Sequence, residues 1–356
     1  MSIKKWIKTW FSLLAVIPII ALVNYYIDPF WTFSHSHKFN QIQKPFNERQ
    51  QKTNDIYFNG FEKYDGILVG SSRATYINQN HFGDMNIYNY AFNSSRPIEF
   101  KGYIDFAKEL NGKELKYIVI GADFFGTKKP SVVKSQGAEI YVNNVKSFAY
   151  RYKTILSSTT FIESIKNIFS SIKGESRVYY TRENLKYKRD ITDKKRFSRY
   201  KKNIKNRTYG FSDKKYKYDD NYIKTMQKIK DTNLNTKFSI YTSPIHANLL
   251  LSQLKNNPSR VDDYKRWLRE LVEVFGEVHH FMDINSVTTK LSNYPDAEHF
   301  YENVGKFLAN KISHQNSANI PDDFGIILDS SNIESYLVKF ENKIKNYTLD
   351  IKKHTY

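Results

Sequence analysis

Short apolar runs alternate with longer amphipathic stretches from about residue 60 to residue 312. Five apolar runs predict strands: Gly66–Gly70, Ile87–Phe92, Tyr117–Gly121, Phe238–Thr242 and Val278–Ile284. Four stretches with apolar residues at helical spacing predict helices: Glu99–Leu110, Asp220–Asp231, Arg260–Phe275 and His299–Ile312. Strands that alternate with helices indicate a parallel sheet covered on both faces. We therefore expect an α/β fold, a three-layer α/β/α sandwich around a five-stranded parallel, flavodoxin-like sheet.

The first 27 residues differ from this pattern, because they contain no Asp or Glu. Thr9–Ile27 is almost entirely apolar and follows Lys4, Lys5 and Lys8. A helix of this length spans about 28 Å, close to the thickness of a bilayer's hydrocarbon core. The preceding lysines predict a cytoplasmic N-terminus and a chain that continues outside the cytoplasm. A cleaved signal peptide is disfavoured because no A-x-A-like site follows the run, and a core helix is disfavoured because the run has no polar face.

These patterns divide the chain into successive parts. We expect a cytoplasmic N-terminus at 1–8, a transmembrane signal anchor at 9–27, a linker at 28–59, an α/β domain at 60–313 with a basic insertion at about 130–218, and a C-terminal tail at 314–356. Within the tail, only Ile333–Tyr347 has a weakly amphipathic pattern, to which we assign no role.

Composition narrows the classes of function. Hydrophobic residues make up 40% of the 356 residues, which is enough for a core and excludes a mainly disordered chain. The chain has no cysteine, which excludes a disulfide scaffold, a thiolate metal site and a cysteine nucleophile. The net charge of +19 indicates an anionic partner, which is a nucleic acid, an anionic lipid or an anionic glycan. An extracytoplasmic location would exclude nucleic acid.

Much of the positive charge lies in one stretch, Arg182–Lys217. It contains 15 basic residues and four acidic ones, so its net charge is +11. The plainest interpretation is a solvated loop. The alternatives are a surface that binds anionic lipid headgroups and one that binds an acidic polysaccharide.

A serine that follows the first predicted strand is the first candidate for chemistry. It stands in Gly70-Ser71-Ser72-Arg73. In parallel α/β sheets, active sites lie beyond the C-terminal ends of the strands. Ser72 at such a position would expose its hydroxyl beside backbone N–H groups that stabilise an oxyanion. The structural alternative is an ordinary helix cap.

The second candidate follows the last predicted strand, in Asp296-Ala297-Glu298-His299. A serine hydroxyl needs a base, and a histidine whose tautomer is fixed by a carboxylate supplies it. An Asp three residues before a His, at a helix start, places both side chains on the same side of the turn. Asp296 as a helix cap is the structural alternative. Because both motifs fall at the same sheet edge, we predict a triad of Ser72, His299 and Asp296.

On these motifs the chain resembles the SGNH (GDSL-type) hydrolase superfamily over residues 60–312. Its N-terminus, with Ile27-Asp28-Pro29-Phe30, is similar to the membrane-anchored DltD/AlgJ/PatB-like branch, which accompanies membrane-bound O-acyltransferases. The block Gly70-Ser71-Ser72 matches the family's first motif, which implies that Ser72 is the nucleophile. The block Asp296–His299 matches the last motif, which implies a base and its orienting carboxylate.

The family's middle blocks match less closely. The second block usually supplies a glycine N–H to the oxyanion hole, whereas this chain has Asn93 and Ser94 there, whose backbone N–H groups or the Asn93 amide would substitute. The third block usually carries an asparagine donor. Here it carries Asp123, which accepts hydrogen bonds only, when ionised. We expect Asp123 to pair with Arg73 or Arg96, or to bind an acceptor hydroxyl.

Three further histidines follow predicted strands or lie within one. His246 comes after the fourth strand, where it either lines the same pocket or is a hydrogen-bonded structural residue. His279 and His280 are adjacent in a strand and point to opposite faces, so they cannot easily share a metal. We expect no metal and no cofactor.

The resemblance implies a membrane-tethered, extracytoplasmic O-acyltransferase that O-acetylates a cell-surface polysaccharide through an acyl-serine. Its implied partner is a membrane-bound O-acyltransferase that supplies the acyl group. The basic insertion would hold an anionic polysaccharide or contact lipid headgroups, and we expect no binding of nucleic acid. Two alternatives remain: an esterase that uses the same triad on a carbohydrate or lipid, and a non-catalytic accessory protein of a polysaccharide-modification complex.

Overall fold

The computed structural model describes residues 2–130, 137–174, 178–255, 257–315 and 319–348. The chain forms two compact units, each assembled from two segments. Unit 1 takes Met1–Glu62 and Gln136–Arg189, and unit 2 takes Lys63–Ser135 and Asp190–Tyr356. Residues 28–59, expected as a linker, therefore belong to a folded unit, and the expected basic insertion is divided between the two units at Arg189.

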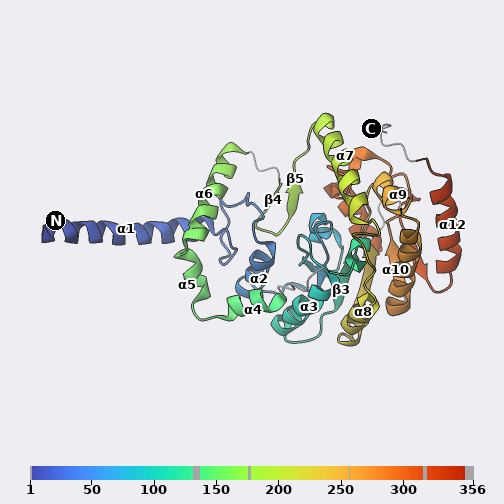
Figure 1. The fold of residues 1–356 in the computed structure, drawn as a ribbon. Helices are drawn as coiled ribbons and strands as arrows, with labels where there is room; N and C mark the ends of the chain where they lie inside the picture. Colours follow the sequence, from blue (N-terminus) through green and yellow to red (C-terminus); the bar gives the residue numbers. More distant parts are fainter. Residues whose placement is uncertain (1, 131–136, 175–177, 256, 316–318, 349–356) are drawn as a thin grey trace. The chain divides into compact units, whose positions relative to one another are not determined.

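Unit 2 is built on a six-stranded sheet with the order β2-β1-β3-β6-β7-β8 (Figure 1). The strands are β1 (Gly66–Val69), β2 (Ile87–Asn89), β3 (Tyr117–Ala122), β6 (Lys237–Thr242), β7 (Glu277–His280) and β8 (Ile326–Asp329). The first five strands in this order are parallel, with pairs such as Ile67↔Ile118 and Ile118↔Phe238. All four residues of β1 are buried, as expected for a strand covered on both faces.

The predicted sheet is wrong in two respects, since it has a sixth strand and that strand is antiparallel. β8 pairs with β7 through Val278↔Leu328. The strand has only four residues, and of these Ile326 and Ile327 are exposed. Ile326-Ile327-Leu328 is an apolar run, but it lies in the stretch 314–356 that was expected to be a tail, so this short edge strand was not predicted.

Seven α-helices of the described chain belong to unit 2. They are α3 (Pro97–Asn111), α7 (Asp193–Gly210), α8 (Tyr222–Asp231), α9 (Ala247–Lys255), α10 (Ser259–Phe275), α11 (Glu302–Ile312) and α12 (Ile333–Asn346). Val304 and Leu308 of α11 join a core cluster with Leu68, Val119 and Tyr241 of the sheet. The helix predicted over His299–Ile312 begins at Glu302, three residues later than expected.

Unit 1 combines helices with a two-stranded hairpin. The elements are α1 (Ile3–Ile27), α2 (Glu48–Phe58), α4 (Ala138–Lys146), α5 (Tyr150–Ile155), α6 (Ser158–Lys173), β4 (Val178–Tyr180) and β5 (Lys186–Lys188). The amide of Asn24, near the end of α1, donates to Ile155 O at 2.8 Å and to Ser157 O at 3.0 Å. A buried ion pair of 2.8 Å joins Asp28 to Arg182. These contacts explain how segments distant in sequence form one unit.

The predicted transmembrane span, Thr9–Ile27, lies within α1. The N-terminal part of this helix extends beyond the rest of unit 1 (Figure 1), and its Trp6 and Phe11 side chains are exposed. In the described part of the chain, however, no helix has both the length and the apolar content needed to cross a membrane. The structure therefore gives the predicted anchor no support.

Candidate active site

Ser72 lies in the turn that connects β1 to a short 3-10 helix, η1 (Ala74–Tyr76). The hydroxyl of Thr75 donates to Ser72 O at 2.6 Å and fixes this turn. No α-helix follows, and the N-cap of η1 is Arg73, which makes no capping hydrogen bond through its side chain. Ser72 is therefore not a helix cap. It is half-buried, so its hydroxyl remains open to a small substrate.

Asp296 organises the bend that carries His299. Its Oδ1 accepts hydrogen bonds from the backbone N–H groups of Glu298 and His299, both at 2.9 Å. The same carboxylate lies 3.1 Å (Oδ1) and 3.2 Å (Oδ2) from His299 Nδ1. Because the following helix begins only at Glu302, Asp296 caps this bend and not a helix.

The structure brings the three predicted side chains together. Ser72 Oγ lies 3.0 Å from His299 Nε2, across 227 positions of sequence. Since the Asp296 carboxylate can only accept, Nδ1 of His299 carries the proton and Nε2 accepts from the Ser72 hydroxyl. The ring of Tyr76 packs edge-on against the imidazole, with centroids 5.9 Å apart. This arrangement can activate a serine hydroxyl by general-base catalysis.

Beside the triad, Arg73 and Asp123 form a buried ion pair. Arg73 Nη1 lies 2.7 Å from Asp123 Oδ1, and the two side chains are 6% and 4% exposed. The guanidinium also lies over the ring of Phe125, 5.2 Å from its centroid. Of the two expected pairings of Asp123, the structure forms the one with Arg73. Its other oxygen, Oδ2, is buried and bonds to no described residue, so it can still accept from a hydroxyl.

The remaining predicted oxyanion and substrate residues, apart from His246, lie in the turn after β2 and at the N-cap of α3. Arg96 donates from Nη1 to Lys128 O at 2.8 Å and begins α3, so it does not pair with Asp123. Asn93 and Ser94 are exposed in the turn after β2. Ser94 has a φ of 56°, so the backbone here is left-handed, a conformation that glycine favours although the sequence has none.

Two backbone groups remain available as oxyanion donors. In the part of the chain that the structure describes, neither the Ser72 N–H nor the Ser94 N–H donates to another residue. The Ser72 N–H belongs to the same residue as the candidate nucleophile. The turn that holds Ser94 follows β2, whose neighbour in the sheet is β1, the strand that precedes Ser72.

His246 is buried and contacts the bend that carries His299. Its backbone N–H donates to Ala297 O at 3.0 Å, between Asp296 and Glu298. Its ring packs edge-on against Tyr200, with centroids 4.9 Å apart, and its Nδ1 accepts from the N–H of Asn248 at 3.2 Å. The exposed fraction of the residue is 4%. These contacts match the structural role that the sequence left open for it.

Sequence reasoning missed the residues that tie this bend to α7. Glu298 Oε1 accepts from Asn203 Nδ2 at 3.1 Å and also binds Arg207 Nε. On the other side of His299, the hydroxyl of Tyr301 donates to Asp190 Oδ1 at 2.8 Å. The only sequence signals were an acid within Asp296–His299 and a basic run about 90 residues earlier, and neither indicated that the two meet.

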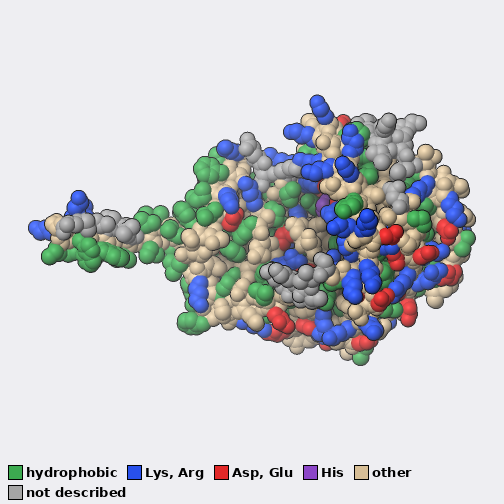
Figure 2. Space-filling model, in the orientation of Figure 1, with side chains coloured by type: hydrophobic (Ala, Val, Ile, Leu, Met, Phe, Trp, Pro, Cys, Tyr) green, Lys and Arg blue, Asp and Glu red, His purple; other side chains and the backbone are tan. Residues whose placement is uncertain are grey.

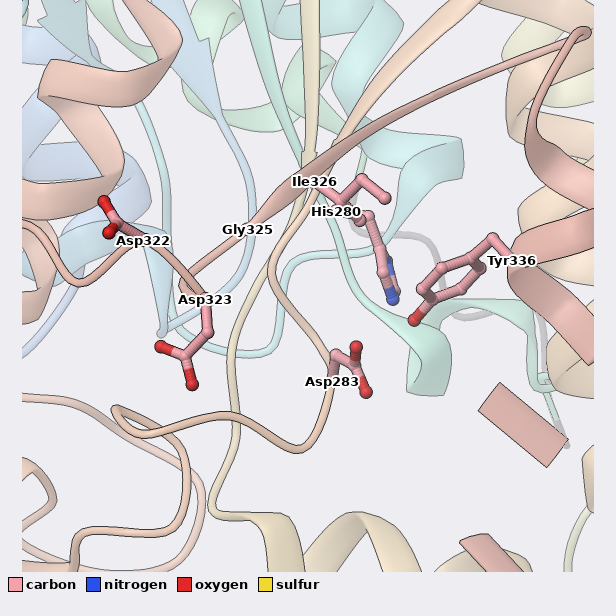
Figure 3. A pocket seen from close by; sticks show the side chains of 7 residues that line it. All are labelled: His280, Asp283, Asp322, Asp323, Gly325, Ile326 and Tyr336. Atoms are coloured by element: carbon pink, nitrogen blue, oxygen red, sulfur yellow. The ribbon is translucent and has the colours of Figure 1, made fainter. Parts of the chain in front are cut away.

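A hollow away from the three predicted triad residues lies in unit 2, with a volume of about 320 Å³ (Figure 3). It is lined by His280, Asp283, Asp322, Asp323, Gly325, Ile326 and Tyr336. No triad residue lines it. His280 has its Nδ1 2.9 Å from the Thr242 hydroxyl, and burial lowers its pKa to about 3, so it stays neutral. Among the described residues, no group of His, Asp and Glu is arranged to hold a metal ion.

Comparisons with protein-family models, with curated proteins and with solved structures find no match to this chain.

Proposed function

We propose that this chain is an acyl-transfer enzyme whose nucleophile is Ser72. The observation that carries the proposal is the hydrogen-bonded series from Ser72 Oγ through His299 to Asp296, with separations of 3.0 Å and 3.1 Å. Such a series is what a serine nucleophile requires: a base within hydrogen-bond reach and a carboxylate that orients the base.

The reaction proceeds in two balanced steps. Ser72 Oγ attacks the carbonyl carbon of an acyl ester while His299 Nε2 takes the hydroxyl proton, and that proton then passes to the departing alcohol. An acyl-serine remains. An acceptor hydroxyl next loses its proton to His299 and attacks the same carbon, and Ser72 regains a proton as its bond to the acyl group breaks. The N–H groups of Ser72 and Ser94 are our candidates for oxyanion donors.

The proposed acceptor is a hydroxyl of a cell-surface polysaccharide, and the proposed acyl group is acetyl. This part of the proposal extends the resemblance to the membrane-anchored SGNH branch. It includes an extracytoplasmic location, a membrane tether at the N-terminus and a membrane-bound O-acyltransferase as acyl supplier. The candidate triad lies at the C-terminal edge of a mostly parallel sheet. This position supports the part of the resemblance that concerns the fold.

An esterase is the second candidate, since water and a sugar hydroxyl compete for the same acyl-serine. The observation that favours it is the exposure of the base, because the His299 side chain is 21% exposed and water reaches it. Transfer would instead require that the acceptor displaces this water.

The test is the intact mass of the full-length protein after exposure to an activated acetyl ester. We expect an adduct of one acetyl group on wild type and none on Ser72→Ala. Addition of sugar acceptors that shorten the adduct's lifetime would favour transfer, whereas rapid ester turnover without an adduct would favour hydrolysis. Absence of both adduct and turnover, in protein purified with its membranes, would overturn the proposal and leave a binding protein.

A further inference from the structure

Helix α7 presents a continuous row of lysines to solvent. We call its exposed members the lysine face: Lys194, Lys195, Lys201, Lys202 and Lys205. Figure 2 shows Lys and Arg side chains gathered over this helix. None of the five makes an ion pair with a residue that the structure describes. Asp193, the acidic residue in the first turn of α7, is itself paired with Arg196. The positive charge is therefore not neutralised within the described chain.

The opposite side of α7 packs against the rest of unit 2. Arg196, Tyr200 and Ile204 are buried, and the Tyr200 hydroxyl accepts from Asn248 Nδ2 of α9 at 2.7 Å. Thr208 donates to Ser252 Oγ, also of α9, at 2.7 Å. The lysine face thus has a fixed orientation on unit 2.

α7 is also attached to the bend that carries the base. The contacts of Glu298 with Asn203 and Arg207 lie on one side of His299. On the other side, Arg196 binds Asp190 at 2.6 Å, and Asp190 accepts from Tyr301. The residues of α7 that make these contacts lie on the side of the helix opposite the lysine face, so a ligand on that face would be separated from the bend by the width of one helix, about 10 Å.

We propose that the lysine face of α7 binds an anionic polysaccharide, the acceptor of the proposed acyl transfer. This inference rests on the proposed function and names its substrate class. Lys195 and Lys202 are seven residues apart, so their charges repeat at about 10 Å along the helix. A repeating charge suits a polymer that carries an acidic group at intervals better than it suits one small anion.

The contacts favour a soluble polymer over a lipid surface. A helix that lies on a membrane needs an exposed apolar face beside its basic one, and the other face of α7 is buried against α9. Lysines act as point charges without the fixed fork of arginine, so they tolerate a polymer that slides or varies in register. Carboxylate groups and phosphate groups would both bind to these lysines.

The test compares two triple variants of the full-length protein. One removes charge from the lysine face, with Lys195→Gln, Lys202→Gln and Lys205→Gln. The matched control removes the same charge from exposed lysines of α8 and α12, with Lys224→Gln, Lys228→Gln and Lys339→Gln. Binding is measured by titration calorimetry with oligogalacturonate as a carboxylate polymer, polyphosphate as a phosphate polymer and neutral dextran.

We expect affinity for at least one anionic polymer to fall about tenfold or more in the α7 variant at low salt, with a shallower salt dependence, and to stay within twofold in the control. Dextran should not bind. Equal binding by both variants, or equal binding of dextran, would overturn the inference. So would anionic phosphatidylglycerol vesicles that displace the polymer, since the face would then serve a membrane.

Failure of this inference can be told apart from failure of the proposed function. Ser72→Ala should bind the polymer as wild type does, because it leaves α7 unchanged. The α7 variant should still form the Ser72 adduct with an activated acetyl ester, because that reaction needs no polymer.

Discussion

Asp296 holds both the backbone and the ring of His299. One carboxylate oxygen, Oδ1, lies 2.9 Å from the backbone N and 3.1 Å from Nδ1. The carboxylate therefore shapes the bend and fixes the tautomer of the base at the same time. Substitutions at this one position can separate the two roles.

Asp296→Asn should keep the bend and lose the reaction. An asparagine oxygen in place of Oδ1 still accepts the N–H groups of Glu298 and His299, but its NH₂ group then faces Nδ1. This NH₂ group competes with the oxygen for Nδ1 and favours the tautomer whose proton is on Nε2, and in that tautomer Nε2 no longer accepts from Ser72. We expect ester turnover to fall about 10⁴-fold with little change in unfolding temperature.

Asp296→Ala is the control, because it removes both roles. It should lower turnover and also speed hydrogen exchange across the bend. If Asp296→Asn kept turnover within tenfold of wild type, the proposed role of the carboxylate would be wrong.

Gly305→Ala should disturb the alignment of Ser72 and His299. A Cβ at Gly305 of α11 would lie 2.8 Å from the carbonyl oxygen of Tyr76, which ends the 3-10 turn after Ser72. Alanine normally stabilises a helix relative to glycine. A loss of activity in this variant would therefore be due to the close approach of the added Cβ to Tyr76. We expect kcat for ester turnover to fall about 10- to 100-fold, since small misplacements are costly in catalysis.

Gly210→Ala is the matched control for this prediction. It also lies in a helix, and no atom is within 4 Å of its added Cβ. It should leave kcat unchanged and raise stability slightly. Equal kcat values in the two variants would show that the contact of α11 with Tyr76 does not position the site.

Asp123→Ala should destabilise unit 2, because it leaves the Arg73 charge buried without its partner. Removal of one member of a buried ion pair costs about 3–5 kcal/mol. The measurement is urea unfolding followed by hydrogen exchange in β3. The double variant Arg73→Met with Asp123→Ala should recover much of the loss, and a double variant as unstable as the single one would argue against an electrostatic cause.

Lys52 makes the stability of unit 1 depend on pH. Burial, opposed in part by the nearby Glu48 carboxylate, lowers the pKa of Lys52 to about 7. An unfolded lysine keeps a pKa near 10.5, so between these values the unfolded chain binds a proton that the folded chain does not. The free energy of unfolding should therefore rise between pH 7 and pH 9, by at most about 1.4 kcal/mol per pH unit.

Fluorescence of Trp31 can follow this change. Trp31 is buried in unit 1, and its ring lies 5.4 Å from that of Tyr180, over which the Lys52 ammonium sits. The other three tryptophans of the chain, Trp6, Trp10 and Trp267, would first be replaced by phenylalanine. In Lys52→Met the rise with pH should disappear, and a rise that persisted would place its origin elsewhere.

The sequence predicted the local features of unit 2 well. The apolar runs around Leu68, Val119 and Ile240 mark strands because burial on both faces leaves no polar positions. Ser72 was found because it follows β1 directly, and Asp296–His299 because a D-x-x-H motif comes after the last predicted strand, although it lies well beyond the end of β7 at His280. Helices α3, α8 and α10 begin within two residues of the predicted positions.

Features that depend on distant contacts were not predictable in this way. The ion pair of Asp28 with Arg182 gives no periodic signal, so residues 28–59 read as a linker. The pairing of Glu298 with Arg207 likewise joins residues 91 positions apart, with no pattern in either segment to indicate it. Ser94 is a third case. Its backbone is left-handed, but no glycine stands there to indicate this conformation in the sequence.

The division of each unit between two segments constrains the order in which the protein can fold during synthesis. Met1–Glu62 cannot complete unit 1 until Gln136–Arg189 has left the ribosome. By then β1, β2 and β3 have also emerged, and the edge of β3 must wait for β6 to pair with it. The nascent chain therefore carries an unpaired, apolar strand edge while the second segment of unit 1 is synthesised, a state that invites aggregation and calls for chaperone protection.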